Sequence, residues 1–314
     1  MSKVDASPQR RLLETSGGTT SDAFGMAEWG LLAGVAVIWG SSFLFIDIGL
    51  EALRPGVVSL ARIALGALAL AVFPRARRPV AREDLPRVAL LGVVWMGIPL
   101  ILFPIAQQWI DSSVAGMINA AVPILTAVWS MVLLRRLPGV LQRWGLVVGF
   151  AGILAISWPN LQGSSATALG VALVLTAVVL YGLAANLAVP LQQRYGALPV
   201  LLRSQLVALA VIAPFGLSQL DGSSWAWGPA LAMVPLGTLG TGLAFVGMTT
   251  LVGRVGGPRG SVAIYFTPIV AIALGVALRA EPLSPWALLG TAMVLGGAWL
   301  TSRKEAPAPA RATP

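Results

Sequence analysis

The sequence predicts an all-α polytopic membrane protein, with ten transmembrane helices arranged as two inverted five-helix repeats. Three observations lead to this prediction: an apolar composition, ten apolar runs of helix-spanning length, and an internal repeat. Of the 314 residues, 57% are hydrophobic and only 11% are charged, and the mean hydropathy is +0.83. A soluble domain carries about 25% charged residues. A chain this poor in charge could not cover a water-exposed surface, so most of its surface must face lipid.

The apolar runs recur at about the length that a helix needs to cross a bilayer, ~20 residues. The third and fourth runs are separated by little more than Trp109–Ser112. The polar stretches 1–28 and 301–314 are expected to be disordered cytoplasmic tails, which places the repeats at 29–158 and 168–300. The predicted helices are Trp29–Leu50, Val57–Phe73, Val88–Gln108, Ser113–Leu134, Trp144–Trp158, Ala168–Leu187, Leu198–Leu217, Pro229–Leu251, Gly260–Leu278 and Pro285–Leu300.

The basic residues predict the orientation of these helices. With both termini inside, 18 of the 21 Lys and Arg residues fall on the cytoplasmic side, Arg54 and Arg279 fall outside, and Arg62 lies within a helix. Such a bias is the positive-inside pattern of membrane proteins. It accounts for the net charge of +9 without nucleic-acid binding, and it predicts a multi-pass protein with both termini in the cytoplasm.

An internal repeat appears at an offset of 145 residues. Pro123 then meets Pro268 within similar tripeptides, and Gly152 meets Gly297. Because five helices per half is an odd number, the second half must enter the membrane with opposite polarity. Glu281 corresponds to Arg136 at this offset, as the positive-inside rule requires when the equivalent loops lie on opposite sides.

Several functions are excluded by composition. The chain has no Cys and no His, so disulfides, thiol catalysis, His or Cys metal ligation and a Ser-His-Asp triad cannot occur. Lys3 and Lys304 are the two lysines and neither lies in a glycine-rich loop, which excludes a P-loop for ATP. We expect no enzyme activity, no metal and no other cofactor, and any uphill transport must draw on an ion gradient or an exchanged solute.

Short motifs in both halves resemble the EamA-type members of the drug/metabolite transporter superfamily. The resemblance spans about Trp29 to Leu300, and no motif is specific alone; their order across the two halves carries it. A departure is Arg136, where such families often carry Glu. The matching stretches are Trp39-Gly40-Ser41-Ser42-Phe43, Leu60-Ala61-Arg62 after Pro55, Gly240-Thr241-Gly242-Leu243-Ala244-Phe245, Tyr265-Phe266-Thr267-Pro268, Glu281-Pro282-Leu283 and Leu289-Gly290.

The resemblance implies a bacterial inner-membrane transporter with two repeats around a central cavity. It would work by alternating access and export amino acids, related metabolites or xenobiotics. The alternatives are a passive facilitator or exchanger, and a membrane scaffold without transport. Substrate, direction and coupling ion stay open.

Two charged residues, Asp47 and Arg62, lie clearly inside predicted helices, whereas Arg203 lies near a helix end. Charge within the membrane is costly and marks functional sites. Asp47 lies ~5 Å and Arg62 ~8 Å below the outer end of their helices, at 1.5 Å per residue. An Asp47–Arg62 ion pair is geometrically plausible. It could be structural, or it could serve as an outer gate, as a coupling site, or as an anchor for a substrate carboxylate.

Asp111 lies in the short turn before Ser112 and Ser113. We expect its carboxylate to cap the following helix by accepting backbone N–H bonds, rather than to carry protons.

The helix-interior prolines Pro123 and Pro268 are the second indication of a site. Each removes a backbone hydrogen bond, and breaks at corresponding positions of two halves point to a transporter's binding site. The polar residues Asn119 and Tyr265 lie near them. These side chains are expected to face a central cavity, with hydrogen bonding between helices as the alternative.

Two pairs of residues on the first and sixth predicted helices are further candidates for the cavity wall. They are Trp39 with Ser42, and Tyr181 with Asn186. Their aromatic rings could stack on a small-molecule substrate, and their polar groups could orient it. The small-residue pattern Gly145–Gly149 and its counterpart near Gly290 could support packing within the bundle or a homodimer.

Overall fold

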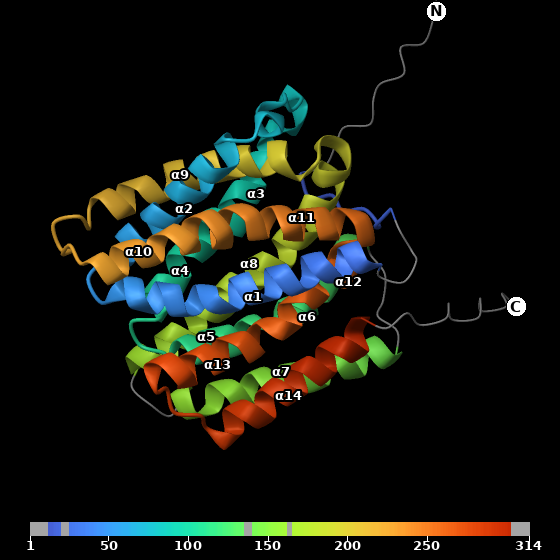
Figure 1. Ribbon diagram of the computed structural model, residues 1–314. Helices are drawn as coiled ribbons and strands as arrows, with labels where there is room; N and C mark the ends of the chain where they lie inside the picture. The colour runs from blue at the N-terminus through green and yellow to red at the C-terminus, as the bar shows by residue number, and fades with distance from the viewer. Residues whose placement is uncertain (1–11, 20–24, 135–139, 162–164, 303–314) are drawn as a thin grey trace, which may run out of the picture.

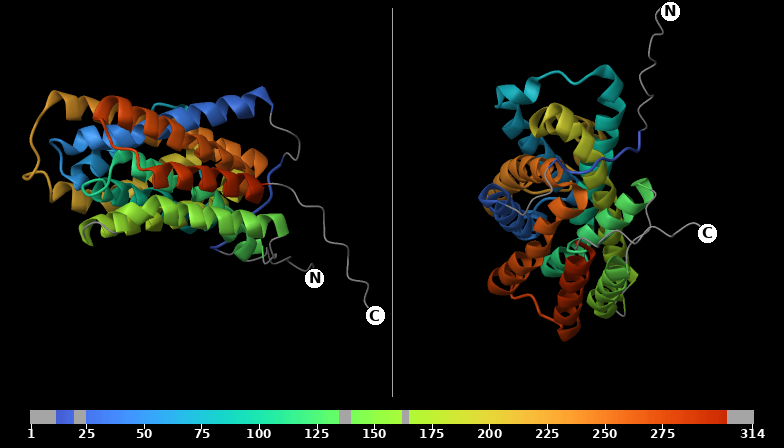
Figure 2. Two further views of the ribbon diagram at one scale, coloured as in Figure 1. Left: turned by 90° about the horizontal axis from the view of Figure 1, so that it is seen from below. Right: turned by 90° about the vertical axis from the view of Figure 1, so that its right-hand side faces the viewer.

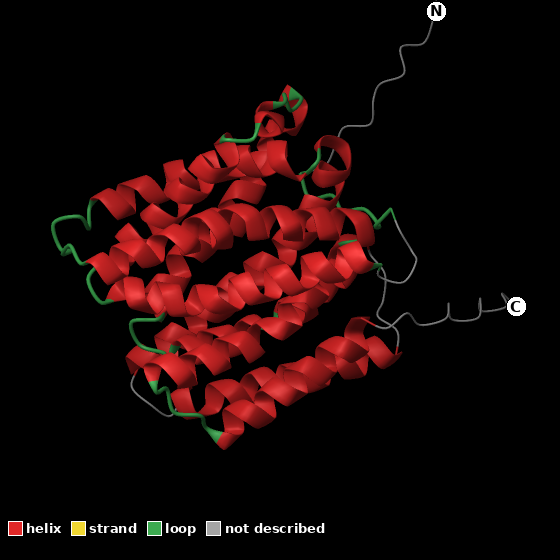
Figure 3. Ribbon diagram, viewed as in Figure 1, coloured by secondary structure: helices red, strands yellow, loops and turns green. Residues whose placement is uncertain are grey.

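The computed structural model describes residues 12–19, 25–134, 140–161 and 165–302, and all regular structure within them is helical (Figure 3). Three stretches change helix type along their length, because segments with π or 3-10 geometry interrupt the α-helix. The elements are α1 (Met26–Leu50), α2 (Pro55–Ala71), η1 (Pro74–Arg77), η2 (Arg82–Asp84), α3 (Leu85–Leu91), η3 (Gly92–Gly97), α4 (Ile98–Ala106), α5 (Ser112–Asn119), α6 (Val122–Leu134), α7 (Val140–Leu161), α8 (Ser165–Tyr195), α9 (Ala197–Leu217), α10 (Trp227–Pro235), η4 (Leu236–Leu243), α11 (Ala244–Val255), α12 (Gly257–Gly260), η5 (Ser261–Phe266), α13 (Thr267–Arg279) and α14 (Pro285–Ser302).

Seven helical stretches of the described chain are long and apolar enough to cross a bilayer, and three shorter apolar helices accompany them. The long ones include the composite stretches α3–η3–α4, α5–α6, α10–η4–α11 and α12–η5–α13. The shorter three are α2 and the apolar parts of α7 and α14. Each predicted run coincides with one of these stretches, although α8 continues past Leu187 to Tyr195. The chain is therefore a multi-pass membrane protein.

The helices run side by side in one elongated bundle (Figures 1 and 2). Large apolar side chains such as Leu68, Phe150, Ile269 and Leu278 are exposed on its sides, where lipid rather than water would solvate them. Two tight reversals need glycine, because Gly196 and Gly256 have φ of 78° and 84°, in the left-handed region that other residues avoid.

Helix breaks lie beside both predicted prolines. The helix α5 ends at Asn119 and α6 begins at Val122, so Pro123 is in the first turn of α6. Likewise, the 3-10 segment η5 ends at Phe266, and Pro268 is in the first turn of α13. A proline is tolerated there because its missing N–H would lack an intrahelical partner anyway.

The contacts of α1 with α13 resemble those of α8 with α6. A Cβ added at Gly40 would lie 2.5 Å from the Cβ of Val270, and one added at Gly182 would lie 2.8 Å from the Cβ of Leu125. Val270 and Leu125 are 145 positions apart. In both crossings, therefore, a glycine contacts one of two residues that are equivalent at the 145-residue offset.

A second pair of contacts follows the same rule. A Cβ at Gly237 would lie 2.5 Å from the Cβ of Leu65, and one at Gly92 would lie 3.0 Å from the Cβ of Val207. Gly92 and Gly237 are again 145 positions apart, and they lie in the π-helical segments η3 and η4. The π geometry therefore recurs at the repeat offset.

The helices α7 and α14 form a pair at one side of the bundle, at the bottom of Figure 1. Their backbones meet at glycine: a Cβ at Gly152 would lie 2.7 Å from the carbonyl oxygen of Gly290, and the reverse distance is 2.6 Å. The small-residue faces thus serve packing within the bundle, the first of the two roles that the sequence left open.

Part of the N-terminal tail, residues 12–19, contacts the helix bundle. Thr15 Oγ1 donates to the carbonyl oxygen of Asn186 at 3.1 Å, and Glu14 forms an ion pair with Arg87 at 3.3 Å. The Asn186 carbonyl lies four residues before Pro190, which has no N–H to bond it within α8. Thr19 Oγ1 donates to Arg254 O in the last turn of α11 at 3.4 Å, so residues 12–19 lie against the end of the bundle where α8 and α11 finish.

Candidate functional site

A central cavity lies among α1, α2, α4, α6, α8 and α11, beside the breaks in the helices. Its volume is about 40 Å³, and since a water needs about 10–15 Å³ of such space, it holds only a few water molecules. A metabolite can enter only after the helices separate. The lining residues are Trp39, Ser42, Phe43, Ile46, Arg62, Trp95, Phe103, Asn119, Val122, Tyr181, Ala185, Phe245, Met248 and Ile264.

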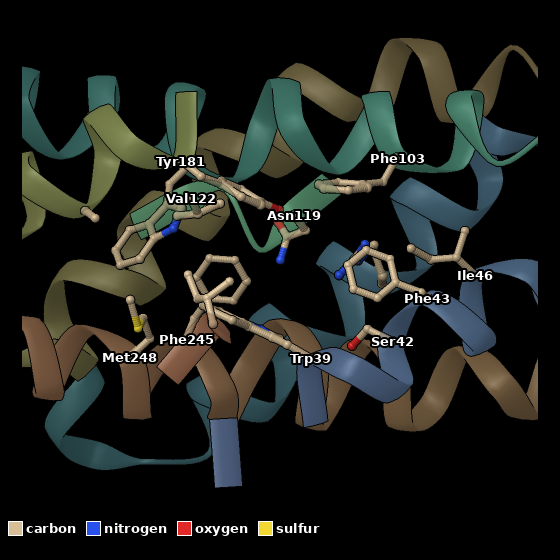
Figure 4. Close-up of a pocket in the computed structure, with 14 residues that line it drawn as sticks. Trp39, Ser42, Phe43, Ile46, Phe103, Asn119, Val122, Tyr181, Phe245 and Met248 are labelled. Atoms are coloured by element: carbon tan, nitrogen blue, oxygen red, sulfur yellow. The ribbon is translucent and has the colours of Figure 1, made fainter. Parts of the chain in front are cut away.

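Aromatic rings form most of the cavity wall (Figure 4). Phe245 lies edge-on to both Trp39 and Trp95, with ring centroids 5.0 and 5.3 Å apart. Phe103 stacks on Tyr181 at 5.8 Å. Such geometry is the favourable one for aromatic pairs, and it gives the cavity a rigid apolar surface.

The π-helical segment η4 positions two of the polar lining residues. Its geometry leaves backbone carbonyls without intrahelical partners, and the carbonyl oxygen of Gly240 accepts a bond from Trp39 Nε1 at 2.9 Å. Thr241 Oγ1 donates to Leu236 O and accepts from Arg62 Nε, both at 3.1 Å. The glycine-rich run Leu236–Leu243 therefore fixes the Trp39 ring and the Arg62 guanidinium.

Arg62 is buried, with 4% of its surface exposed. Its bond to Thr241 uses one of five N–H donors, and no acidic side chain within the described residues forms an ion pair with it. The cavity thus contains a positive charge to which the described part of the chain supplies no counter-charge.

Two hydrogen-bonding groups on opposite helices also face the cavity. The Oδ1 atom of Asn119 is buried without a hydrogen-bond partner, and this residue ends α5 at the break before Pro123. In Figure 4 its side chain points from the Tyr181 side toward the space between Phe43 and Phe245. Ser42 Oγ donates to its own helix, at Ile38 O, which leaves its lone pairs available.

Five predicted residues, Trp39, Ser42, Asn119, Tyr181 and Arg62, therefore line one cavity. Asn186 and Tyr265 are not among the lining residues. Asn186 Nδ2 donates to the carbonyl oxygens of Thr126 and Gly182 at 2.9 Å, which ties α8 to α6. Tyr265 is buried in the core.

The expected Asp47–Arg62 ion pair is wrong. Asp47 pairs instead with Arg279 at the end of α13, and Arg279 also contacts Glu51 at 2.6 Å. The physical reason is depth: Asp47 lies near the bundle end within reach of a loop-proximal cation, whereas Arg62 is buried deeper against η4.

A second correction concerns Asp111. It occupies the N-cap position of α5, but its side chain makes no capping bond. Glu281, from the loop after α13, caps the helix instead: its carboxylate accepts from Ser112 N, Ser112 Oγ and Ser113 N at 3.0, 2.6 and 2.9 Å. Partial burial and the nearby charges of Glu281 and Asp47 raise the pKa of the Asp111 carboxyl.

Together these groups surround a polar vestibule of about 710 Å³, lined by Asp47, Gln107, Asp111, Arg279 and Glu281 among others. The vestibule and the central cavity share no lining residue. The separating layer contains the Phe43–Phe103 ring pair at 5.6 Å and the bond from Gln107 Nε2 to Phe43 O at 2.9 Å.

The opposite end of the bundle carries a network that the sequence reasoning missed. Asp84 is fully buried and accepts bonds from Arg87, Arg194 and the Tyr195 hydroxyl at 3.3, 2.8 and 2.5 Å. The network joins η2 and α3 to the end of α8. The acidic pair Glu83-Asp84 between Arg82 and Arg87 was a signal of it.

The sequence reasoning also missed four aromatic residues of the cavity wall, because sequence alone does not separate them from core or lipid-facing residues. They are Phe43, Trp95, Phe103 and Phe245. For metals, no group of three or more Asp and Glu side chains converges within the described ranges.

Fold and site thus define a multi-pass membrane protein with an internal, mainly aromatic cavity and with polar networks at both ends of its helix bundle. A sequence profile of the EamA-like transporter family matches residues 28–158 and 168–303. The chain belongs to the EamA-like transporter family, which confirms the resemblance read from its motifs.

Several relatives carry transporter names. An "uncharacterized transporter" of Archaeoglobus fulgidus is 26% identical over 89% of this chain and all of its own length. A "probable terminal-alkyne amino-acid exporter" of Streptantibioticus cattleyicolor is 28% identical, covering 88% of this chain and 94% of that protein. The "uncharacterized inner membrane transporter YedA" of Escherichia coli is 29% identical, covering 83% and 87%. A solved crystal structure shares the fold with a TM-score of 0.64 at 18% identity, over 89% of this chain and 98% of that one.

Proposed function

We propose that the chain is a secondary transporter that exports small metabolites, by alternating access through the central cavity. The candidate solutes are amino acids or related compounds, and xenobiotics. The observation that carries the proposal is the cavity itself, which residues from both family-matched stretches line beside the helix breaks. The name of the Streptantibioticus relative supports export of an amino-acid-like compound.

The proposed architecture is ten transmembrane helices in two inverted halves, 29–158 and 168–300, with both termini in the cytoplasm of a bacterial inner membrane. The contacts of Gly40 with Val270 and of Gly182 with Leu125 support the repeat, because an internal two-fold axis would exchange them. The distribution of basic residues supports the orientation.

In the alternating-access cycle the two polar networks act as gates. The outer gate comprises Asp47, Arg279 and Glu281 with the start of α5, and the inner gate comprises Asp84 with Arg87 and Arg194. The ion pairs of both networks are formed in this structure. Opening one network at a time would connect the cavity to one side of the membrane, which is the requirement of the mechanism.

A passive facilitator or exchanger is the second candidate. The observation that favours it is the ion pair of Asp47 with Arg279, because a carboxylate held by a guanidinium is a poor proton carrier.

Counterflow in proteoliposomes tests the proposal. Liposomes that contain the purified protein are loaded with unlabelled amino acids and small metabolites. Uptake of the labelled solute is then measured with and without a pH gradient. Uptake that follows the proton gradient supports coupled transport, and pH-insensitive counterflow supports the exchanger. Absence of both flux and solute binding across the panel would favour a scaffold.

A further inference from the structure

The central cavity contains one charged side chain, Arg62, and no acidic side chain of the described residues pairs with it. Arg62 donates through Nε to Thr241, and its two Nη groups make no hydrogen bond or ion pair within the residues that the structure describes. An uncompensated charge among apolar groups is costly. A ligand that brings a negative charge to this position would remove that cost.

The acids nearest in the fold cannot supply the charge. Asp47 belongs to the vestibule and pairs with Arg279, and Glu281 caps α5. Both are fixed outside the layer formed by Phe43, Phe103 and Gln107. The counter-charge must therefore come from the solute.

Two further polar groups restrict what the solute carries. The Tyr181 hydroxyl lines the cavity and forms no hydrogen bond to another described residue, so it can donate to an anionic oxygen. Asn119 offers a buried acceptor, Oδ1, that has no donor. Around these groups the wall is aromatic: Trp39, Trp95 and Phe245 form one continuous edge-to-face cluster.

We propose that the cavity binds organic carboxylates with an apolar or aromatic body, and that Arg62 is the residue that selects for the carboxylate. A guanidinium matches a carboxylate through two parallel hydrogen bonds, and the rings take the apolar body. Asn119 accepts a bond from an ammonium or hydroxyl group where the solute has one. This inference rests on the proposed transport function and names the chemistry that its binding site selects.

Three probes with a common phenyl group separate the contributions. L-phenylalanine carries a carboxylate and an ammonium, 3-phenylpropanoate carries only the carboxylate, and phenethylamine carries only the ammonium. The full-length protein in lipid nanodiscs is titrated with each by isothermal calorimetry. We expect both carboxylates to bind, and phenethylamine to bind at least about tenfold more weakly, the loss of one hydrogen bond to a charged group.

Variants then assign the selection to residues. Arg62→Gln should lower the affinity for both carboxylates by about 10- to 100-fold and should not weaken phenethylamine, because its ammonium no longer meets a like charge. Asn119→Ala should weaken the binding of phenylalanine and phenethylamine, which carry an ammonium, and leave that of 3-phenylpropanoate unchanged. The matched control is Arg203→Gln, because Arg203 is a partly buried arginine on α9 that bonds Ala76 O and Pro199 O and does not line the cavity.

Three results would overturn the inference. One is wild-type protein that binds phenethylamine as tightly as phenylalanine, a comparison that needs no variant to fold. Another is Arg62→Gln with unchanged affinity for the carboxylates, and a third is inorganic phosphate displacing 3-phenylpropanoate at equal concentration. If none of the three probes binds, the carboxylate class is wrong, whereas counterflow of other solutes would leave the transport proposal standing.

Discussion

The capping of α5 by Glu281 can be tested by a pair of adjacent serines. Ser112 Oγ donates to the Glu281 carboxylate at 2.6 Å, whereas the buried Ser113 Oγ makes no hydrogen bond. Ser112→Ala removes one bond to a charged group, which is worth about 1.5–3 kcal/mol. Ser113→Ala keeps its backbone N–H bond to Glu281 and should change stability by less than about 0.5 kcal/mol. The two substitutions therefore differ in the stability that they remove, although the serines are adjacent and both buried.

Substitution of the carboxylate sets the upper limit of the effect. Glu281→Ala removes all three bonds and leaves two N–H groups of the α5 terminus unpaired, which predicts a loss of about 3–5 kcal/mol. Thermal unfolding in detergent, followed by tryptophan fluorescence, should give midpoints in the order wild type, Ser113→Ala, Ser112→Ala, Glu281→Ala. Equal midpoints for the two serine variants, or a wild-type midpoint for Glu281→Ala, would show that Glu281 does not hold α5.

Three further perturbations follow from the same contacts. Gly290→Ala should destabilise the α7–α14 pair by about 1–3 kcal/mol through overpacking, whereas Gly296→Ala on the same helix meets open space and should be neutral or stabilising. The thermal midpoints of the two variants test this difference, and equal shifts would contradict the packing. Arg279→Gln breaks the contacts to α1. Because the chain has no cysteine, a Ser42→Cys reporter can be labelled by an impermeant thiol reagent, and Arg279→Gln should speed this labelling. An unchanged labelling rate would refute the expectation. Because the folded-state pKa of Asp111 is raised, its charged form destabilises the fold above that pKa, and this destabilisation disappears as the pH falls through it. Asp111→Asn should therefore raise the thermal midpoint at pH 8 and lose this advantage at acid pH. An equal gain at both pH values would contradict the predicted pH dependence.

The sequence was sufficient for features that depend on lipid as solvent. Composition and run length predicted the apolar helices, and the prolines at 123 and 268 marked the two breaks, because each feature is local in the chain. Five site residues were predicted to face one cavity or to be charges within the membrane, and they do lie around one cavity. Polar residues within a bilayer are few, so most of them had to face inward.

Partner choice could not be predicted in this way. Asp47 and Arg62 were predicted to lie at similar depth on consecutive helices, yet Arg62 is buried deeper and Arg279, 232 positions away, pairs with the Asp47 carboxylate. Asp111 occupies the residue position of a cap, yet Glu281 from 169 positions away makes the bonds to Ser112. Both errors come from assuming that the nearest charge in sequence is the partner, whereas packing of α13 against α1 and α5 brings other groups closer.

The helix contacts recur in both halves of the chain, whereas the buried charge occurs in one half only. Under the proposed repeat the glycines of η3 and η4 exchange roles, since Gly237 meets the carbonyl oxygen of Arg62 and Gly92 meets that of Ser204. Arg62 therefore corresponds to Ser204, and the charge occurs in one half only. A guanidinium at both positions would place two cations in the same apolar interior, at a cost that one carboxylate could not offset. The repeat can therefore be symmetric in its helix crossings while the binding site is asymmetric in charge, and a solute with one carboxylate at one end is the kind of molecule that such a site accommodates.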